Sequence, residues 1–269
     1  MTTPWAPPVR AYMSRGLVSV RPTTSLADVQ RIFEEREISA VPVMDGASLV
    51  GIVTSTDLLR EARLELIPPG SVMRVTPPPH TAADLMRRDV LTISDGAPIL
   101  DAVKVMLARH VHRLVVIREG TPVAVVSVRD AMRAVFDERI PTPLRAVMTT
   151  PVVAIEMGET VDAAIAQLDD ANVHGLVVVD EGWPIGVFTH TEAIRSRALA
   201  PSLRQMPVER VMSYETICLD VTTPLYRVAA YSIQMRARRI LAVDKRDLVG
   251  VVTGFDLLRV LEAWVRPQA

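Results

Sequence analysis

The stretch Gly51-Ile52-Val53-Thr54-Ser55-Thr56-Asp57, GIVTSTD, occurs in the chain in four related copies. The other three are AVVSVRD ending at Asp130, GVFTHTE ending at Glu192 and GVVTGFD ending at Asp256. One copy alone is typical of a helix N-terminus, because a hydroxyl residue followed three positions later by an acid can satisfy free backbone N–H groups. Four copies indicate an internal repeat, and the repeat decides the architecture.

A methionine precedes each copy at a constant distance. Each of these methionines lies 41 residues before the hydroxyl residue of its motif, for example from position 13 to position 54. The four pairs are Met13 with Thr54, Met86 with Ser127, Met148 with Thr189, and Met212 with Thr253. Such constancy is strong evidence for four equivalent units.

Each unit has the same predicted order of elements. Short apolar runs at 17–20, 90–93, 152–155 and 216–219 predict a first strand. An amphipathic helix follows, with Ser25 as a predicted N-cap, and with Pro98 and Pro224 predicted at the first helical position. Two more strands, at 40–43 and 49–53 in unit one, flank the turn signal Asp45-Gly46 and predict a hairpin. A closing helix begins inside the motif and is predicted over 57–66 in unit one. The sequence therefore predicts an α/β fold of four β-α-β-β-α units.

The predicted units span residues 9–66, 82–137, 144–198 and 208–265. A unit of about 55 residues buries little surface alone, so pairs of units are expected to pack together. Residues 67–82 are predicted to form a long Pro-rich linker between units one and two. Because sequential elements usually neighbour each other, we pair unit one with two and unit three with four.

Composition excludes several function classes. The 269 residues carry 30 Lys and Arg against 31 Asp and Glu, which lacks the basic excess of a DNA-binding protein. A single cysteine, Cys218, allows no disulfide framework. No signal peptide and no apolar run of membrane-spanning length is present in the sequence, so a cytoplasmic protein without membrane contact is predicted. No metal is predicted, since His110 and His112 have no partner acid or cysteine nearby in sequence.

With its Met-Ser/Thr start, its Val41-Pro42-Val43 strand and its closing G-h-x-T-x-x-D motif (h for apolar), the unit resembles the CBS domain. Four copies resemble two tandem Bateman modules, each a pseudo-two-fold pair of CBS units. Unit two, HVHRLVVIREGTPVAVVSVRDAM, resembles repeats in the gamma subunit of AMP-activated protein kinase. The resemblance implies a non-catalytic, energy-sensing regulator that binds AMP, ADP or ATP in clefts between paired units.

The resemblance also implies roles for residue types. The motif acid binds the ribose hydroxyls, the motif hydroxyl approaches ribose or phosphate, apolar strands sandwich the base, and Arg or His near the hairpin strand binds phosphate. The chemistry agrees, because a carboxylate accepts from both hydroxyls of a cis-diol, while helix N-termini and Arg bind phosphate. The implied ligand residues are Thr54, Asp57, Val41 and Val43 in unit one; Ser127, Asp130, His112, Arg113 and Arg129 in unit two; Thr189 in unit three; and Thr253, Asp256, Arg238 and Arg239 in unit four.

The four motifs are unequal. Unit one matches throughout, but Ser39-Ala40 stand where a basic residue is expected. Unit two has Ala124 in place of glycine. Unit three has Glu192 in place of Asp, and we expect it to be mainly a capping residue. The sequence therefore ranks units one and four as the best sites and unit three as the weakest.

A second hypothesis competes with nucleotide sensing. The imperfect motifs also suit an assembly protein whose clefts are degenerate and whose role is dimerisation or docking of an unknown protein partner. An enzyme is disfavoured, since the sequence has no Walker loop, no G-x-S-x-G and no metal-ligand cluster. We expect a homodimer through its CBS pairs, and an output that passes to a separate partner or through self-association.

Overall fold

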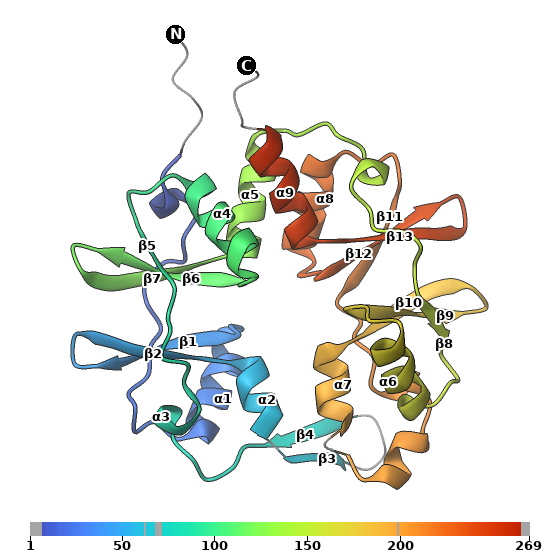
Figure 1. Cartoon of the computed structure of the whole chain (residues 1–269), viewed down its shortest axis with the longest axis horizontal. Helices are drawn as coiled ribbons and strands as arrows, with labels where there is room; N and C mark the ends of the chain where they lie inside the picture. The colour runs from blue at the N-terminus through green and yellow to red at the C-terminus, as the bar shows by residue number, and fades with distance from the viewer. Residues whose placement is uncertain (1–6, 62, 68–71, 198, 265–269) are drawn as a thin grey trace.

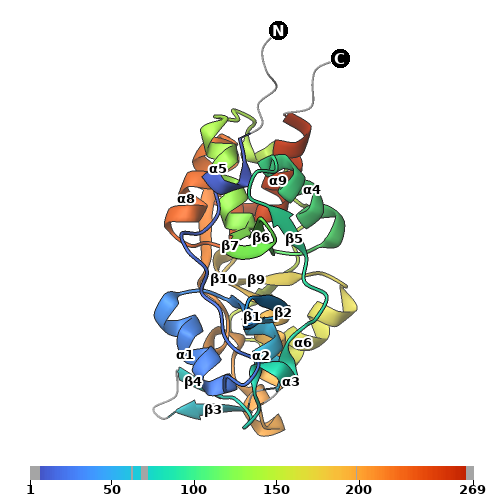
Figure 2. The same ribbon diagram turned by 90° about the vertical axis from the view of Figure 1, so that its left-hand side faces the viewer.

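The computed structural model describes residues 7–61, 63–67, 72–197 and 199–264. Its four units lie around a flat disc, seen face-on in Figure 1 and edge-on in Figure 2. In Figure 1 unit two is at the upper left, unit four at the upper right, unit three at the lower right and unit one at the lower left. The predicted ends of units three and four, at 198 and 265, lie outside the described residues.

The predicted α/β fold is confirmed, and the β-α-β-β-α order is found in units two, three and four. Unit one contains α1 (Leu26–Arg36), β1 (Ala40–Asp45), β2 (Ser48–Thr54) and α2 (Ser55–Glu61). Unit two contains β5 (Thr92–Ser94), α4 (Ile99–Arg109), β6 (Arg113–Arg118), β7 (Thr121–Ser127) and α5 (Val128–Asp137). Unit three contains β8 (Ala154–Glu156), α6 (Val161–Asp170), β9 (Gly175–Asp180), β10 (Trp183–Thr189) and α7 (His190–Arg197). Unit four contains β11 (Thr216–Asp220), α8 (Leu225–Gln234), β12 (Arg239–Asp244), β13 (Asp247–Thr253) and α9 (Gly254–Trp264).

In each unit the two later strands form an antiparallel hairpin, as predicted. In units two to four the first strand joins it in parallel. Left-handed residues at the turns, such as Gly46 with φ 59° and Gly120 with φ 80°, allow the tight reversals. The helix caps also follow the sequence, since the Ser25 side chain accepts a hydrogen bond from Asp28 N. Pro98 and Pro224 are themselves the N-cap residues, one position earlier than predicted, because their ψ angles of 142° and 144° are extended.

Unit one lacks the predicted first strand at 17–20. Only Val20 bridges to Val43 of β1, through hydrogen bonds to its neighbours. In units two and three the next bond of this ladder is donated by Val115 N to Leu91 O and by Val177 N to Val153 O, each at 3.0 Å. The equivalent residue in unit one is Pro42, which has no N–H, so the ladder stops after one bridge.

The prediction of a closing helix over 57–66 is wrong. Helix α2 ends at Glu61, and β3 (Arg63–Ile67) pairs antiparallel with β4 (Val72–Thr76). The alternating sequence RLEL suits a strand, and Pro68-Pro69 cannot continue a helix. The predicted linker 67–82 thus contains a strand, followed by the short helix α3 (Ala82–Leu85).

The leading segment of each unit docks on its sister unit. The residue after each start methionine bridges to the middle of the sister's motif strand: Ser14 on Val125 of unit two, Arg87 on Ile52 of unit one, Thr149 on Val251 of unit four, and Ser213 on Val187 of unit three. This exchange ties unit one to two and unit three to four. The predicted pairing is therefore confirmed.

The apolar core is distributed unevenly. One continuous cluster joins units two and four, with Ile99, Val135, Leu225 and Leu257 all fully buried. Unit one and unit three have separate cores. A smaller cluster of strand residues, which includes Val187 and Leu241, joins the sheets of units three and four. Within the described part of the chain, no helix is long and apolar enough to cross a membrane.

Candidate functional clefts

The motif forms the same helix cap in every unit. In unit one Thr54 donates from its backbone N at 3.2 Å and its hydroxyl at 2.5 Å to Asp57 Oδ2. The same two donors reach Asp130 Oδ2 from Ser127, Glu192 Oε2 from Thr189 and Asp256 Oδ2 from Thr253, all within 2.5–3.0 Å. One carboxylate oxygen of the acid is thus held at the start of a helix. Whether the site can accept hydrogen bonds from a ligand depends on the partners of the second oxygen.

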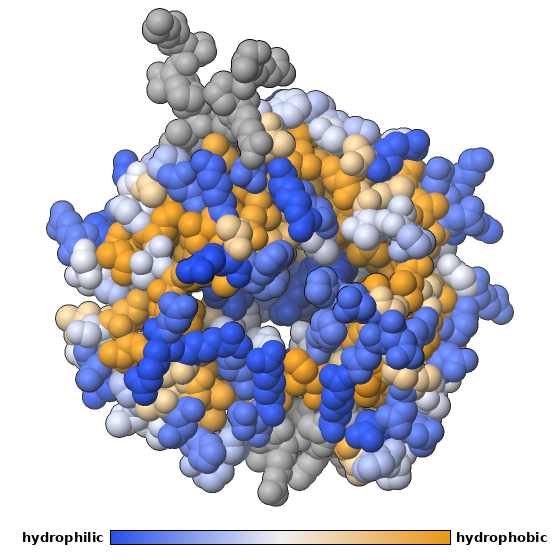
Figure 3. Space-filling view, in the orientation of Figure 1, coloured by the Kyte–Doolittle hydropathy of each residue, from blue (hydrophilic) through white to orange (hydrophobic). Residues whose placement is uncertain are grey.

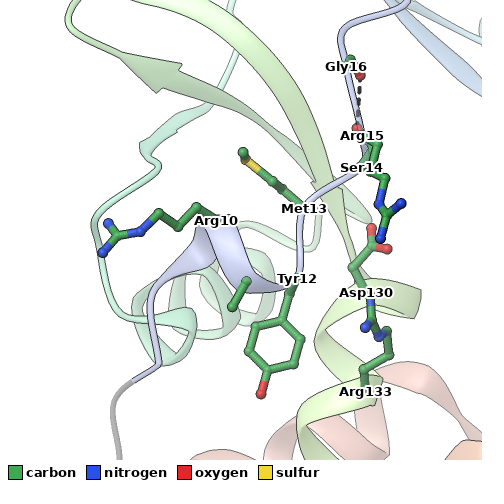
Figure 4. Close-up of a pocket in the computed structure, with 9 residues that line it drawn as sticks. Arg10, Tyr12, Met13, Ser14, Arg15, Gly16, Asp130 and Arg133 are labelled. Atoms are coloured by element: carbon green, nitrogen blue, oxygen red, sulfur yellow. Dashed lines mark hydrogen bonds between the residues drawn. The ribbon is translucent and has the colours of Figure 1, made fainter.

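A cavity of about 480 Å³ lies where the leading segment of unit one crosses unit two. Figure 4 shows Asp130, at the start of α5, with its carboxylate on the side of the segment Ser14–Gly16. The Ser14 hydroxyl accepts a hydrogen bond from Val125 N at 3.1 Å, which fixes the segment. Burial raises the pKa of the Asp130 carboxyl, while its Ser127 hydrogen bonds oppose that shift. Arg10, Arg15 and Arg133 line the same cavity and supply positive charge.

A smaller cavity of about 130 Å³ lies between units three and four. It is lined by Thr189 and Glu192 of unit three and by Ser213, Glu215, Arg238 and Arg239 of the sister segment and unit four. His112 of unit two reaches the same cavity from across the disc. A carboxylate, hydroxyl groups and guanidinium groups therefore share one space.

Basic residues gather around the centre of the disc, which Figure 3 shows as a hydrophilic hollow. Burial lowers the pKa of Arg113 to about 10, with the nearby Arg238 adding to the shift. The pKa of His112 is lowered to about 4, first because protein surrounds much of the ring and then because Arg113, Arg239 and Arg238 are close. His112 nevertheless stays partly exposed, and its ring makes a T-shaped contact with Phe255, with ring centroids 4.7 Å apart. This concentration of positive charge favours an anion.

In unit one the acid already has a partner. Arg87 donates from Nε at 2.9 Å and Nη2 at 2.6 Å to Asp57 Oδ1. The basic residue of the sister unit is also engaged, because Arg113 donates to Ser39 O at 3.1 Å and Ser39 Oγ at 2.8 Å. The unit-one cleft is therefore filled by internal contacts at both positions.

Comparison with known proteins fits this geometry. The family model of the CBS domain matches residues 9–63, 82–137, 144–198 and 208–263. The chain belongs to the CBS domain family. Four CBS units in two Bateman pairs, as the sequence predicted, are thus present.

The CBS chain is similar to several archaeal and bacterial proteins. Uncharacterized protein MJ1404 of Methanocaldococcus jannaschii is 23% identical over 94% of this chain and 62% of its own length, so the chain spans less than two thirds of that relative. CBS domain-containing protein YhcV of Bacillus subtilis is 32% identical over 41% of this chain and 79% of its own. The solved structure of protein MJ1225 of Methanocaldococcus jannaschii, described as a proposed archaeal homologue of γ-AMPK, covers 95% of this chain and 100% of its own at 19% identity and a TM-score of 0.72. A conserved protein from Pyrococcus horikoshii has the same coverage at 22% identity and a TM-score of 0.64. These structures show the fold.

In the fourth CBS unit the acid has an exposed partner. Arg259 donates to Asp256 Oδ1 at 2.5 Å from the next turn of α9, and its side chain is 58% exposed. Arg238 likewise pairs with Glu215 at 2.6 Å, with both side chains exposed. The Arg238–Glu215 pair, exposed on both sides, is of the kind that contributes little to stability, whereas Asp256 in the other pair is only 13% exposed.

The predicted site residues do not all lie together in the structure. His112, Thr189, Arg238 and Arg239 share the unit-three cleft. Val41 and Val43, for which the resemblance implies a contact with the base, are fully buried and belong to the core cluster of unit one, together with Val29 and Phe33 of α1. Arg129 is exposed beside Asp130, and Thr253 caps α9 with Asp256.

Sequence reasoning missed the leading segments. Ser14, Arg87 and Ser213 reach the clefts from the sister unit, at the position directly after the start methionine. The signal was available, since the four residues at this position are Ser14, Arg87, Thr149 and Ser213 and one of them is charged. The methionines themselves are packing residues: an added Cβ at Gly51 would lie 2.6 Å from Met86 Sδ, and one at Gly250 equally close to Met148 Sδ. The motif glycine thus makes room for the sister methionine.

A metal site has no support in the part of the chain that the structure describes. No group of three or more His, Cys, Asp or Glu side chains among those residues could hold a metal ion. His110 and His112 both contact the ring of Phe255 instead.

Proposed function

We propose that this CBS protein binds adenine nucleotides, namely AMP, ADP or ATP, in the clefts of units two and three and regulates another protein through them. The observation that carries the proposal is the unit-three cavity, where Glu192, Ser213 and Arg239 face one space. A ribose diol needs a carboxylate acceptor, and a phosphate needs guanidinium donors. Both are available there within one small cleft.

Each cleft has separate groups for the ribose and for the phosphate of a nucleotide. The acid at the helix start keeps one oxygen for the ribose hydroxyls, while free N–H groups and the helix dipole favour a phosphate. The central arginines and His112 then supply the remaining positive charge. Binding would relieve the mutual repulsion of these cations, which is the source of the differential affinity that any conformational response requires.

The signalling step is part of the same proposal. A nucleotide that spans two paired units would change their relative orientation, and the change would pass to a protein partner or to a second copy of the chain. A non-catalytic role, energy sensing, homodimerisation and a cytoplasmic location remain predictions from the sequence and the family resemblance. The competing hypothesis is an assembly protein with empty clefts.

Titration calorimetry with AMP, ADP and ATP tests the proposal. We expect binding at micromolar to millimolar concentration, and Arg239→Ala should weaken the affinity of the unit-three cleft about tenfold, or about 1.4 kcal/mol. Arg246→Ala is the matched control, since Arg246 is exposed in the hairpin turn of unit four. No heat with any of the three nucleotides, together with nucleotide-independent assembly in light scattering, would favour the assembly hypothesis.

A further inference from the structure

Arg87 breaks the internal symmetry of the molecule. The residue after the start methionine is a small hydroxyl residue in three segments, Ser14, Thr149 and Ser213, and an arginine in the fourth. All four occupy the same place, because the backbone N–H of each donates to the carbonyl of the second motif residue in the sister unit. The backbone of Arg87 exchanges two hydrogen bonds of 3.0 Å with Ile52, so its side chain starts beside the unit-one motif.

The Asp57 carboxylate has no acceptor capacity left. An ionised carboxylate offers about four lone-pair positions on two oxygens. Two positions, on Oδ2, are taken by the backbone N and hydroxyl of Thr54. The other two, on Oδ1, are taken by Nε and Nη2 of Arg87. All four positions are therefore engaged by internal donors, and a ribose diol finds no free lone pair on this carboxylate.

The clefts of units two and three differ at this point. Asp130 and Glu192 each use one oxygen for the motif hydroxyl residue. Among the described residues, none donates a hydrogen bond to the second oxygen of either acid. Ser14 and Ser213 are too short to reach across as Arg87 does. These two acids can therefore accept from a ligand.

A second contact closes the other end of the unit-one cleft. Arg113 is the basic residue that unit two presents toward its sister, and both of its terminal nitrogens are bonded to Ser39. Its counterpart in the other pair is Arg239, whose guanidinium makes a long contact of 3.4 Å to Arg238 O in its own unit. Both polar positions that a nucleotide would use are thus satisfied internally in unit one and available in unit three.

We propose that Arg87 is the specificity-determining residue that closes the unit-one cleft to ribose, so that unit one is a structural unit and not a nucleotide site. An internal guanidinium competes at high effective concentration, because it loses no translational freedom on binding. Arg259 beside Asp256 is as exposed as Arg87, but it donates only one hydrogen bond to Asp256 Oδ1, whereas Arg87 donates two to Asp57 Oδ1. This inference rests on the proposed nucleotide function of the other clefts.

Native mass spectrometry of the full chain with saturating AMP tests the inference by counting bound nucleotides. Arg87→Ser, which restores the residue type of the other segments, should bind one AMP more than the wild type. Arg88→Ser is the matched control, because it removes the same charge from the exposed neighbouring residue and should leave the count unchanged. Asp57→Asn in the wild-type chain should also leave the count unchanged, and combined with Arg87→Ser it should abolish the gain.

The outcomes separate the two proposals. A wild type that binds no AMP overturns the proposed function itself. A wild type that binds AMP but loses one copy in Asp57→Asn shows that unit one is already a site, and an unchanged count in folded Arg87→Ser shows that Arg87 is not the barrier. Either of these results overturns the inference alone. If Arg87→Ser does not fold, the Asp57→Asn count still decides.

Discussion

The clefts of units one and three occupy equivalent places in the two CBS pairs, yet they have opposite character. In unit one the motif matches the family pattern completely, and Arg87 and Arg113 fill the cleft from within. In unit three the motif departs from the pattern at Glu192, and the cleft contains a cavity of about 130 Å³. The comparison shows that a complete motif describes the helix cap, whereas the residue contributed by the sister unit decides whether a ligand can enter.

The largest expected difference is in stability. Asp57→Ala should lower the free energy of unfolding by about 2 kcal/mol, because it removes a helix cap and a charge-assisted pair and leaves Arg87 without its partner. Glu192→Ala should cost about 1 kcal/mol, since it removes the cap alone. Urea denaturation followed by circular dichroism measures both. Equal losses in the two variants would mean that the contact between Arg87 and Asp57 contributes nothing to the free energy of unfolding, as is found for many exposed ion pairs.

An intermediate effect is expected from moving the arginine. Ser213→Arg places a guanidinium beside Glu192, at the position that Arg87 holds beside Asp57. We expect the affinity of the unit-three cleft for AMP to fall at least about tenfold, or about 1.4 kcal/mol. Titration calorimetry against wild type measures the loss. Ser213→Thr is the control that should retain binding, because threonine is the residue that the equivalent segment has at Thr149. Undiminished affinity in Ser213→Arg would break the comparison.

The smallest expected effect is a pH dependence of the free energy of unfolding, caused by a residue of the unit-three cavity. His112 lines that cavity, and its pKa is lowered to about 4 in the folded chain. An unfolded histidine binds its proton near pH 6.5, so between about pH 6.5 and 4 the unfolded state holds more protons and the free energy of unfolding falls as the pH falls. His112→Gln should therefore lose less stability than wild type between pH 7 and 4.5. If the urea midpoints of the two proteins fall by the same amount between pH 7 and 4.5, the lowered pKa of His112 is contradicted.

The repeat made most of the fold predictable. The constant spacing from Met13 to Thr54 and in its three counterparts fixed the units, and turn signals such as Asp45-Gly46 fixed the hairpins. The departures have local causes. Pro42 removes the N–H that would extend a ladder to residue 18, and the chain after Glu61 forms β3 and not a helix because its polar and apolar residues alternate before two prolines.

The clefts were less predictable, because they form between segments from different units. The motif residues Thr54 and Asp57 could be placed at a helix start from local sequence. The contact of Asp57 with Arg87, 30 residues away, depends on a leading segment that crosses to the sister unit. The burial of Val41 and Val43 depends on which face of β1 meets the helices of unit one. A single-unit pattern contains neither piece of information.

A crystal structure of the full chain grown with AMP tests most directly whether the sister residue decides which cleft is open. We predict AMP in the clefts of units two and three, with its ribose hydroxyls on Asp130 and Glu192, while Arg87 remains on Asp57 and no nucleotide lies beside it. AMP bound to Asp57 with Arg87 displaced, or empty clefts in both units two and three, would contradict this prediction.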